Sequence, residues 1–201
     1  MNLGIVGQAV GLFAVTNIDD LLILALFFAR GAGHRGATRR IAAGQYLGFA
    51  AILAVSIAAA FGATFLPGSA VPYLGLLPLA LGVKAAVQAW RHRGENADQE
   101  TAGHEGGPKT LEVAAVTFAN GGDNIGVYVP VFAGAGTGGM SVYVAVFLLL
   151  PAVWIAAGRC FATRPVIAEV LARWGHVLLP VVLIGIGLLI LVEGGAFGLG
   201  P

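Results

Sequence analysis

The chain has 201 residues, of which 58% are hydrophobic and only 10% are charged. Soluble domains carry about 25% charged residues, and the mean hydropathy here is +0.87. The composition therefore excludes an ordinary soluble protein and indicates a single transmembrane domain over residues 1–201, with the lipid bilayer as its surroundings. The formal net charge of +1 gives no electrostatic support to a nucleic-acid partner.

Long apolar runs follow one another along the chain. A helix that crosses a bilayer needs about 20 predominantly apolar residues, and each of these runs is close to that length. The pattern predicts an all-α integral membrane protein with six transmembrane helices, over residues 3–29, 41–66, 72–90, 111–135, 140–162 and 177–197.

Basic residues occupy alternate connections between these runs. The second and fourth connections and both termini carry no lysine or arginine. By the positive-inside rule, the basic connections face the cytoplasm. We therefore expect a multi-pass protein of the cytoplasmic membrane with both termini outside. Lys84 lies within the third run, near its basic end, where its side chain can snorkel. The basic connections and the ends of the runs that bound them contain Arg30, Arg35, Arg39 and Arg40, then Arg91, Arg93 and Lys109, then Arg159, Arg164 and Arg173.

The second half of the chain resembles the first. Leu76-Leu77-Pro78 aligns with Leu178-Leu179-Pro180, with an offset of 102 between the prolines. Each half contains three predicted helices, and an odd number means that the halves cross the membrane in opposite senses. This is the inverted-repeat plan of many transporters, with a site near the midplane. We expect repeat one at 1–90, a polar cytoplasmic linker at 91–110 and repeat two at 111–201.

Two polar stretches interrupt the apolar runs, and both contain Asn-x-x-Asp. The first pairs Asn17 with Asp20 and the second pairs Asn120 with Asp123, 103 residues later. Residues three apart share a helix face, so each asparagine can point with its aspartate into one space. Asp19 lies about 100° from Asp20 on a regular helix, so both can face that space only where the helix is broken. Intramembrane acids are costly and are functional by default.

These side chains supply carboxylate and carboxamide oxygens. Such oxygens suit divalent cations and, less selectively, Na⁺ or protons, and they favour Mn²⁺ or another borderline ion over a strongly thiophilic one. Three carboxylates exceed the charge of one divalent ion, which favours a proton-linked cycle. The predicted metal ligands are Asn17, Asp19, Asp20, Asn120, Asp123 and Asn124, with Thr16 and Thr117 as supporting hydroxyls.

Three other interpretations stay open at this point. The acids can be internal ion-pair or hydrogen-bond partners, for example Asp19 with Lys84. Two aspartates on different membrane helices can also share a proton, as in an aspartic protease. However, the Gly-x-Gly-Asp spacing, the tyrosine-aspartate partner and the Pro-Ala-Leu motif of intramembrane aspartic proteases are absent. A purely structural protein leaves the repeat and the buried acids unexplained.

The motifs resemble those of the bacterial cadmium resistance transporter family, within the lysine exporter superfamily. The resemblance covers essentially the whole chain and rests on Thr16–Asp20, Tyr73–Pro78 and Ala119–Ile125. It implies an exporter, not an enzyme, with no cofactor and with a divalent cation (Cd²⁺, Zn²⁺ or Mn²⁺) as the transported substrate. Another substrate of the superfamily, such as an amino acid, is the alternative.

The resemblance also favours a homodimer, and the Gly-x-x-x-Gly spacings fit either ordinary helix contacts or a dimer face. These spacings begin at Gly7, Gly44 and Gly194.

Overall fold

The computed structural model describes residues 3–63, 65–67, 70–91, 107–163, 181 and 184–192. These ranges contain helices and no strands, so the predicted all-α class is confirmed for the described part of the chain. Most of the predicted linker at 91–110 and part of the sixth predicted run at 177–197 lie outside the described residues.

The first predicted helix is broken into two. Helix α1 spans Leu3–Thr16 and α2 spans Asp20–Arg30, and their axes differ by 59°. Residues 17–19 form the turn between them. Asp19 caps α2, because its carboxylate accepts a hydrogen bond from the backbone N–H of Asp20, and an acidic residue in the first turn also favours the helix dipole.

Helix α3 spans Ala37–Ala63 and packs closely on α5. A Cβ added at Gly44 would lie 2.6 Å from the carbonyl oxygen of Thr110, and one at Gly48 would lie 2.6 Å from that of Ala114. Only glycine allows this approach. The Gly44-x-x-x-Gly48 motif therefore serves a helix contact within the chain, and the homodimer stays a prediction.

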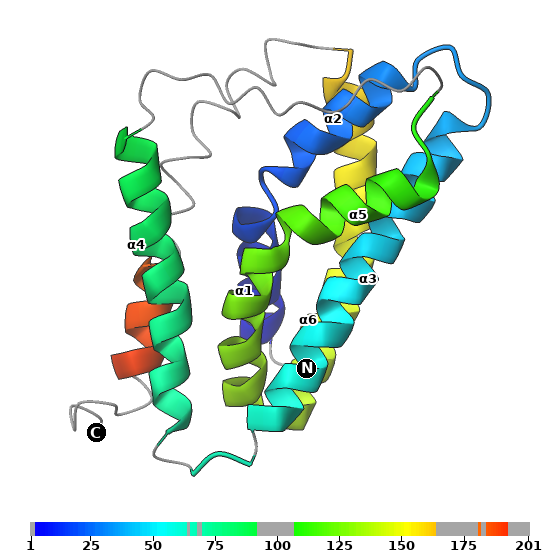
Figure 1. Ribbon diagram of the computed structural model, residues 1–201. Coiled ribbons are helices and arrows are strands. Elements are labelled where there is room, and N and C mark those ends of the chain that lie inside the picture. Colours follow the sequence, from blue (N-terminus) through cyan, green and yellow to red (C-terminus); the bar gives the residue numbers. More distant parts are fainter. Residues whose placement is uncertain are drawn as a thin grey trace.

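The second Asn-x-x-Asp motif also lies at a break. Helix α5 spans Thr110–Asn120, and α6 begins at Gly122 and ends at Phe161. Gly121 interrupts the helix between them, as the glycine pair at 121–122 suggests. Within α6, Gly136 has φ 64° and ψ 176°, a conformation that L side chains rarely adopt, and the chain changes direction there (Figure 1).

Two helices, α3 and α6, are long and apolar enough to cross a membrane, and the bent α1–α2 pair can count as a third. The short 3₁₀ helix η1 (Val71–Gly75) leads into α4 (Leu76–Arg91), and residues 184–192 are helical. Six spans and an inverted repeat are not established by this arrangement and stay predictions.

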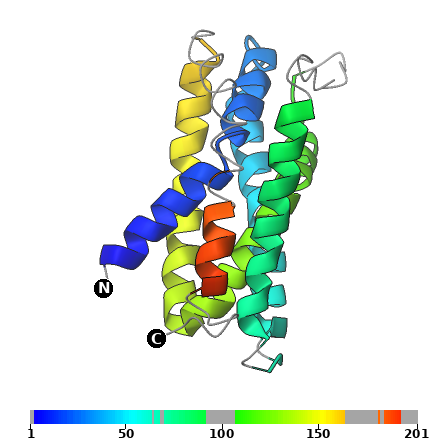
Figure 2. The same ribbon diagram turned by 90° about the vertical axis from the view of Figure 1, so that its left-hand side faces the viewer.

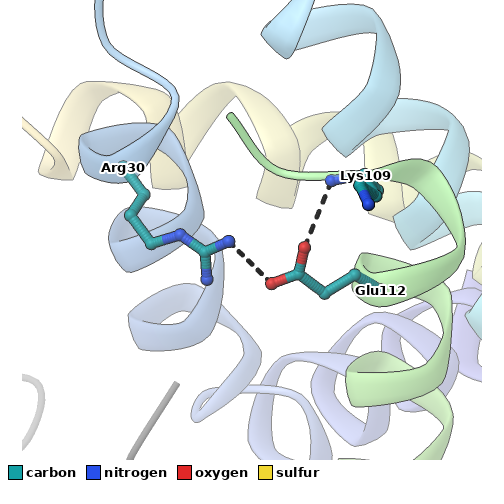
Figure 3. Close-up of polar contacts among 3 residues, drawn as sticks. All are labelled: Arg30, Lys109 and Glu112. Carbon is teal, nitrogen blue, oxygen red and sulfur yellow. Dashed lines mark hydrogen bonds and ion pairs between the residues drawn. The ribbon is translucent and has the colours of Figure 1, made fainter. Parts of the chain in front are cut away.

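Several basic residues gather at one end of the bundle. The C-terminal end of α2, the start of α3, the start of α5 and the C-terminal end of α6 lie together there, while the end of α3 and the bend in α6 lie at the opposite end (Figures 1 and 2). At the first end, Arg30 forms an ion pair of 2.7 Å with Glu112, which ties α2 to α5. Glu112 also accepts a hydrogen bond from the backbone N–H of Lys109 (Figure 3).

Candidate functional site

The two helix breaks meet in one hydrogen-bonded cluster. The carboxamide nitrogen of Asn120, at the end of α5, donates to Oδ2 of Asp19 at 3.0 Å and to Oδ1 of Asp20 at 2.9 Å. Asp19 and Asp20 thus turn toward the same group, although a continuous helix would place them about 100° apart. The condition set by the sequence, that both face one space only where the helix is broken, is met.

Asp20 has a second partner, on α3. Nε2 of Gln45 donates to Oδ2 of Asp20 at 2.9 Å, while Oε1 of Gln45 accepts from the hydroxyl of Thr117 at 2.7 Å. A threonine hydroxyl donates one proton. Because Thr117 donates this proton to Oε1 of Gln45, the amide nitrogen of Gln45 faces Asp20. Gln45 therefore links α5 to the start of α2.

Asn17 lies at the centre of the remaining contacts. Its Nδ2 is within hydrogen-bond distance of the carbonyl oxygen of Phe13 and the hydroxyls of Thr16 and Tyr128, at 2.9 to 3.0 Å. Its Oδ1 accepts from Nδ2 of Asn124 at 3.3 Å. This contact joins the first motif to the second.

The helix break also frees a backbone carbonyl group. The indole N–H of Trp154, in the second half of α6, donates to the carbonyl oxygen of Asn17 at 2.6 Å. A buried carbonyl group without a partner is destabilising. Trp154 therefore stabilises the break between α1 and α2. Its side chain offers no oxygen and no ionisable group that could bind a cation.

Nearly all buried polar side chains of the described residues belong to this cluster. Ser56 is the exception, and it bonds back to the carbonyl oxygen of Ile52 on its own helix. Polar side chains that only form hydrogen bonds with their own helix would not be expected to gather in one place in this way. The buried members are Thr16, Asn17, Asp20, Gln45, Thr117 and Asn124.

Apolar clusters lie on both sides of the polar one. One, which contains Phe13, Phe49 and Tyr128, lies on the side of the bend at Gly136; the other, which contains Leu24, Ile41 and Val113, lies on the side of the Arg30–Glu112 pair. The members of the polar cluster on α1–α2, α3 and α5–α6 lie between these two apolar clusters along the helices. An ion that moves between the polar cluster and either end of the bundle must therefore pass an apolar layer.

Asp123 lies at the edge of the cluster. The backbone N–H groups of Asp123 and Asn124 at the start of α6 favour its negative charge, and that charge acts on both Asp19 and Asp20. Lys84 acts electrostatically on Asp123. The Asp19–Lys84 pair considered from the sequence is not among the ion pairs of the described residues.

The described residues contain no group of three or more histidine, cysteine, aspartate and glutamate side chains that could hold a metal ion. Asp19 and Asp20 are bridged, but Asp123 does not converge on them directly. The predicted ligands Asn17, Asn120 and Asn124 all present their amide nitrogens to the cluster, as Gln45 does. A cation there would need their oxygens instead, because carboxamides bind hard cations through oxygen.

Sequence reasoning missed two polar members of the cluster, Gln45 and Tyr128. Gln45 is the sole carboxamide in its apolar run, 41–66, and that isolation was a usable signal. Tyr128 lies four residues after Asn124, on the same helix face. Thr16 and Thr117 are both in the cluster, in contact with Tyr128 and Gln45 respectively.

A separate cavity of about 770 Å³ lies beyond the first apolar layer, between α1, α6 and the helix at 184–192. Its lining is mostly apolar, with Gln8 and Tyr143 as polar members. These two side chains are 3.3 Å apart. The cavity lacks the acidic oxygens of the polar cluster and is not itself a cation site.

Comparison with known proteins gives one match. A family model described as "Cadmium resistance transporter" matches residues 13–199, a range that contains both polar motifs. No curated protein and no solved structure matches the chain.

Proposed function

The chain belongs to the cadmium resistance transporter family, and from this premise we propose that it exports Cd²⁺ or a related divalent cation across the cytoplasmic membrane. The family is one of transporters, which fits apolar helices able to span a membrane and gives no role to a cofactor. The metal ion is substrate.

The observation that carries the proposal is the meeting of two broken helices at a buried acidic cluster. Asp20 and Asp123 lie in the first turn of the helix that follows each break, while Asn17 is the first residue of the turn at 17–19 and Asn120 is the last residue of α5. Transporters commonly coordinate cations where a membrane helix is interrupted, because unwound backbone and half-helix ends line the site. We assign one cation to this place, held by Asp20 and Asp123 with Asn17 and Asn120, and with Asp19 or Asn124 completing its ligands.

Binding requires a local rearrangement of amides. The NH₂ group of Asn120 lies between the carboxylates of Asp19 and Asp20, the position that a cation between them would take. Rotation of this amide brings its oxygen to the ion, and the ion then relieves the repulsion between the two carboxylates. Asn17 exchanges its nitrogen for its oxygen in the same way, while Thr16 and Thr117 support the ligands through Tyr128 and Gln45.

The membrane arrangement is a second part of the proposal. We place the acidic cluster near the midplane of six helices in two inverted halves, with both termini outside. The end of α2, the start of α3 and the end of α6 lie together at one end of the bundle (Figure 1), and these segments carry Arg30, Arg39, Arg40 and Arg159. This supports the orientation, because positive charge marks the cytoplasmic side. The two apolar layers are then the barriers that open alternately, and a proton gradient drives the cycle. A homodimer and membership of the lysine exporter superfamily are further elements of this proposal.

Cysteine labelling tests the orientation. Cys160 is the single native cysteine, so a Cys160→Ser background accepts one new cysteine at a time. Cysteines at Arg35 and Lys109 are expected to react with a membrane-impermeant maleimide only after the cells are opened, and a cysteine at Gly68 to react in intact cells. Labelling of position 109 in intact cells would overturn the orientation.

The ligand chemistry favours a second candidate substrate. Every predicted ligand atom is an oxygen, and oxygen sets suit Mn²⁺ better than the thiophilic Cd²⁺. Uptake into everted membrane vesicles, with and without a proton gradient, compares Cd²⁺, Zn²⁺, Mn²⁺, Mg²⁺ and Ca²⁺. We expect gradient-dependent uptake of Cd²⁺ or Mn²⁺ above vesicles without the protein. No uptake of any of the five ions would contradict the proposed function, and amino acid uptake would then be the next assay.

A further inference from the structure

Lys84 lies deeper within an apolar run than any other basic residue, six residues before the end of the run at 72–90. The packing of α4 on α6 determines what it faces. The two helices run in opposite directions where they meet (Figure 1). They approach closely at Gly126, where an added Cβ would lie 2.7 Å from Cδ1 of Leu81. Lys84 lies three residues after Leu81, and Asp123 lies three residues before Gly126. In antiparallel helices, this spacing brings Lys84 alongside Asp123.

The electrostatics agree with this register. Lys84 acts on Asp123, and Asp123 acts in turn on Asp19 and Asp20. The other charged side chains that the structure describes lie near the ends of the helices or in their connections; Glu112 among them is paired with Arg30. Between the two ends of the bundle, four charged groups of the described chain therefore form one set: three carboxylates and one ammonium.

We propose that Lys84 sets the valence of the cation that the site accepts, by bringing the three carboxylates and one divalent ion to a net charge of zero. This inference rests on the proposed function. An uncompensated charge is costly in a medium of low dielectric constant. The site therefore favours the ion whose binding brings its net charge to zero. With Lys84 present, that ion is divalent: a monovalent ion leaves one negative charge and a trivalent ion leaves one positive charge.

Lys84 need not touch the ion to have this effect. Its side chain is exposed, at the edge of the cluster, and a unit charge still acts over several ångströms at an effective dielectric constant of about 20. Without the ammonium group, three carboxylates are neutralised by a trivalent ion. Loss of Lys84 therefore shifts the preference of the site toward trivalent cations, whereas loss of a purely structural residue lowers the affinity for every ion.

The test compares two probe ions, Cd²⁺ and La³⁺, by competition with a fluorescent chelator for purified full-length protein in lipid nanodiscs. Lys84→Met is expected to raise the La³⁺ to Cd²⁺ affinity ratio by about tenfold or more, because La³⁺ carries one more unit charge than Cd²⁺ and one unit-charge interaction over several ångströms exceeds the free energy of a tenfold change. Lys84→Arg keeps the charge and should keep the wild-type ratio. Lys84→Gln is a second neutral variant in case the methionine variant does not fold.

The outcomes separate this inference from the proposed function. Cd²⁺ binding by the wild-type protein, with an unchanged or lower La³⁺ to Cd²⁺ ratio in the neutral variants, would overturn the role of Lys84 and leave the cation site standing. A ratio that rises equally in Lys84→Arg would also overturn it, because the charge would not be the cause. Wild-type protein that binds neither ion would overturn the proposed function and this inference with it.

Discussion

Asp20→Asn is expected to abolish metal export while the protein still folds. Asparagine has nearly the same shape as aspartate, and its oxygen can still accept the hydrogen bond from Gln45 that is 2.9 Å long in the wild-type protein. The substitution removes one negative charge from a residue that is only 3% exposed. Loss of one partner of a buried charge interaction costs about 2–5 kcal/mol, so the affinity for a divalent ion should fall about thirtyfold or more.

Uptake of Cd²⁺ and Mn²⁺ into everted vesicles measures this effect, at matched protein amounts. Asn124→Ala is the matched control, because Asn124 is also buried but its side-chain hydrogen bond to Asn17 is long, at 3.3 Å. This control should lose much less transport. Export by Asp20→Asn at the wild-type rate would remove Asp20 from the proposed ligands.

Asp123→Asn should weaken transport as strongly, but for a partly different reason. Asp123 does not join the hydrogen bonds of Asn120 with Asp19 and Asp20, and it acts on both acids through its charge. With Lys84 still present, the variant site would carry an excess positive charge when a divalent ion binds. We therefore expect a loss of uptake to near the level of vesicles without the protein.

The double variant Asp123→Asn/Lys84→Met removes one charge of each sign and restores the balance for a divalent ion. It should recover part of the Cd²⁺ uptake that Asp123→Asn loses, as a double-mutant cycle in vesicles would show. Lys84→Arg in the Asp123→Asn background is the control and should recover nothing. Full wild-type uptake by Asp123→Asn alone would show that this acid is not needed.

The helix breaks could be predicted from sequence because their causes are local. Gly121 and Gly122 weaken a helix wherever they occur, and two adjacent acids in an apolar run can share one space only where the helix is interrupted. The boundary between the runs at 111–135 and 140–162 coincides with the bend at Gly136. Residue types that are close together in the chain are therefore sufficient to predict where these helices break.

The contacts across the cluster could not be predicted in the same way. Gln45 reaches Asp20 from a different helix, 25 residues away in the chain, and a single carboxamide has no periodicity that names its partner. The motif at Gly44 and Gly48 signals a close approach but not which helix approaches, and the partner is α5 rather than a second copy. Six spans and the inverted repeat also exceed what the described helices establish.

The central claim is that one cation binds where the two broken helices meet. Isothermal titration of purified wild-type protein with Cd²⁺ and with Mn²⁺, beside Asp20→Asn and the Asn124→Ala control, tests it most directly. We expect saturable binding of at least one of these ions at one site per chain, retained in Asn124→Ala and lost in Asp20→Asn. Equal binding in the wild type and Asp20→Asn, or none in the wild type, would contradict it.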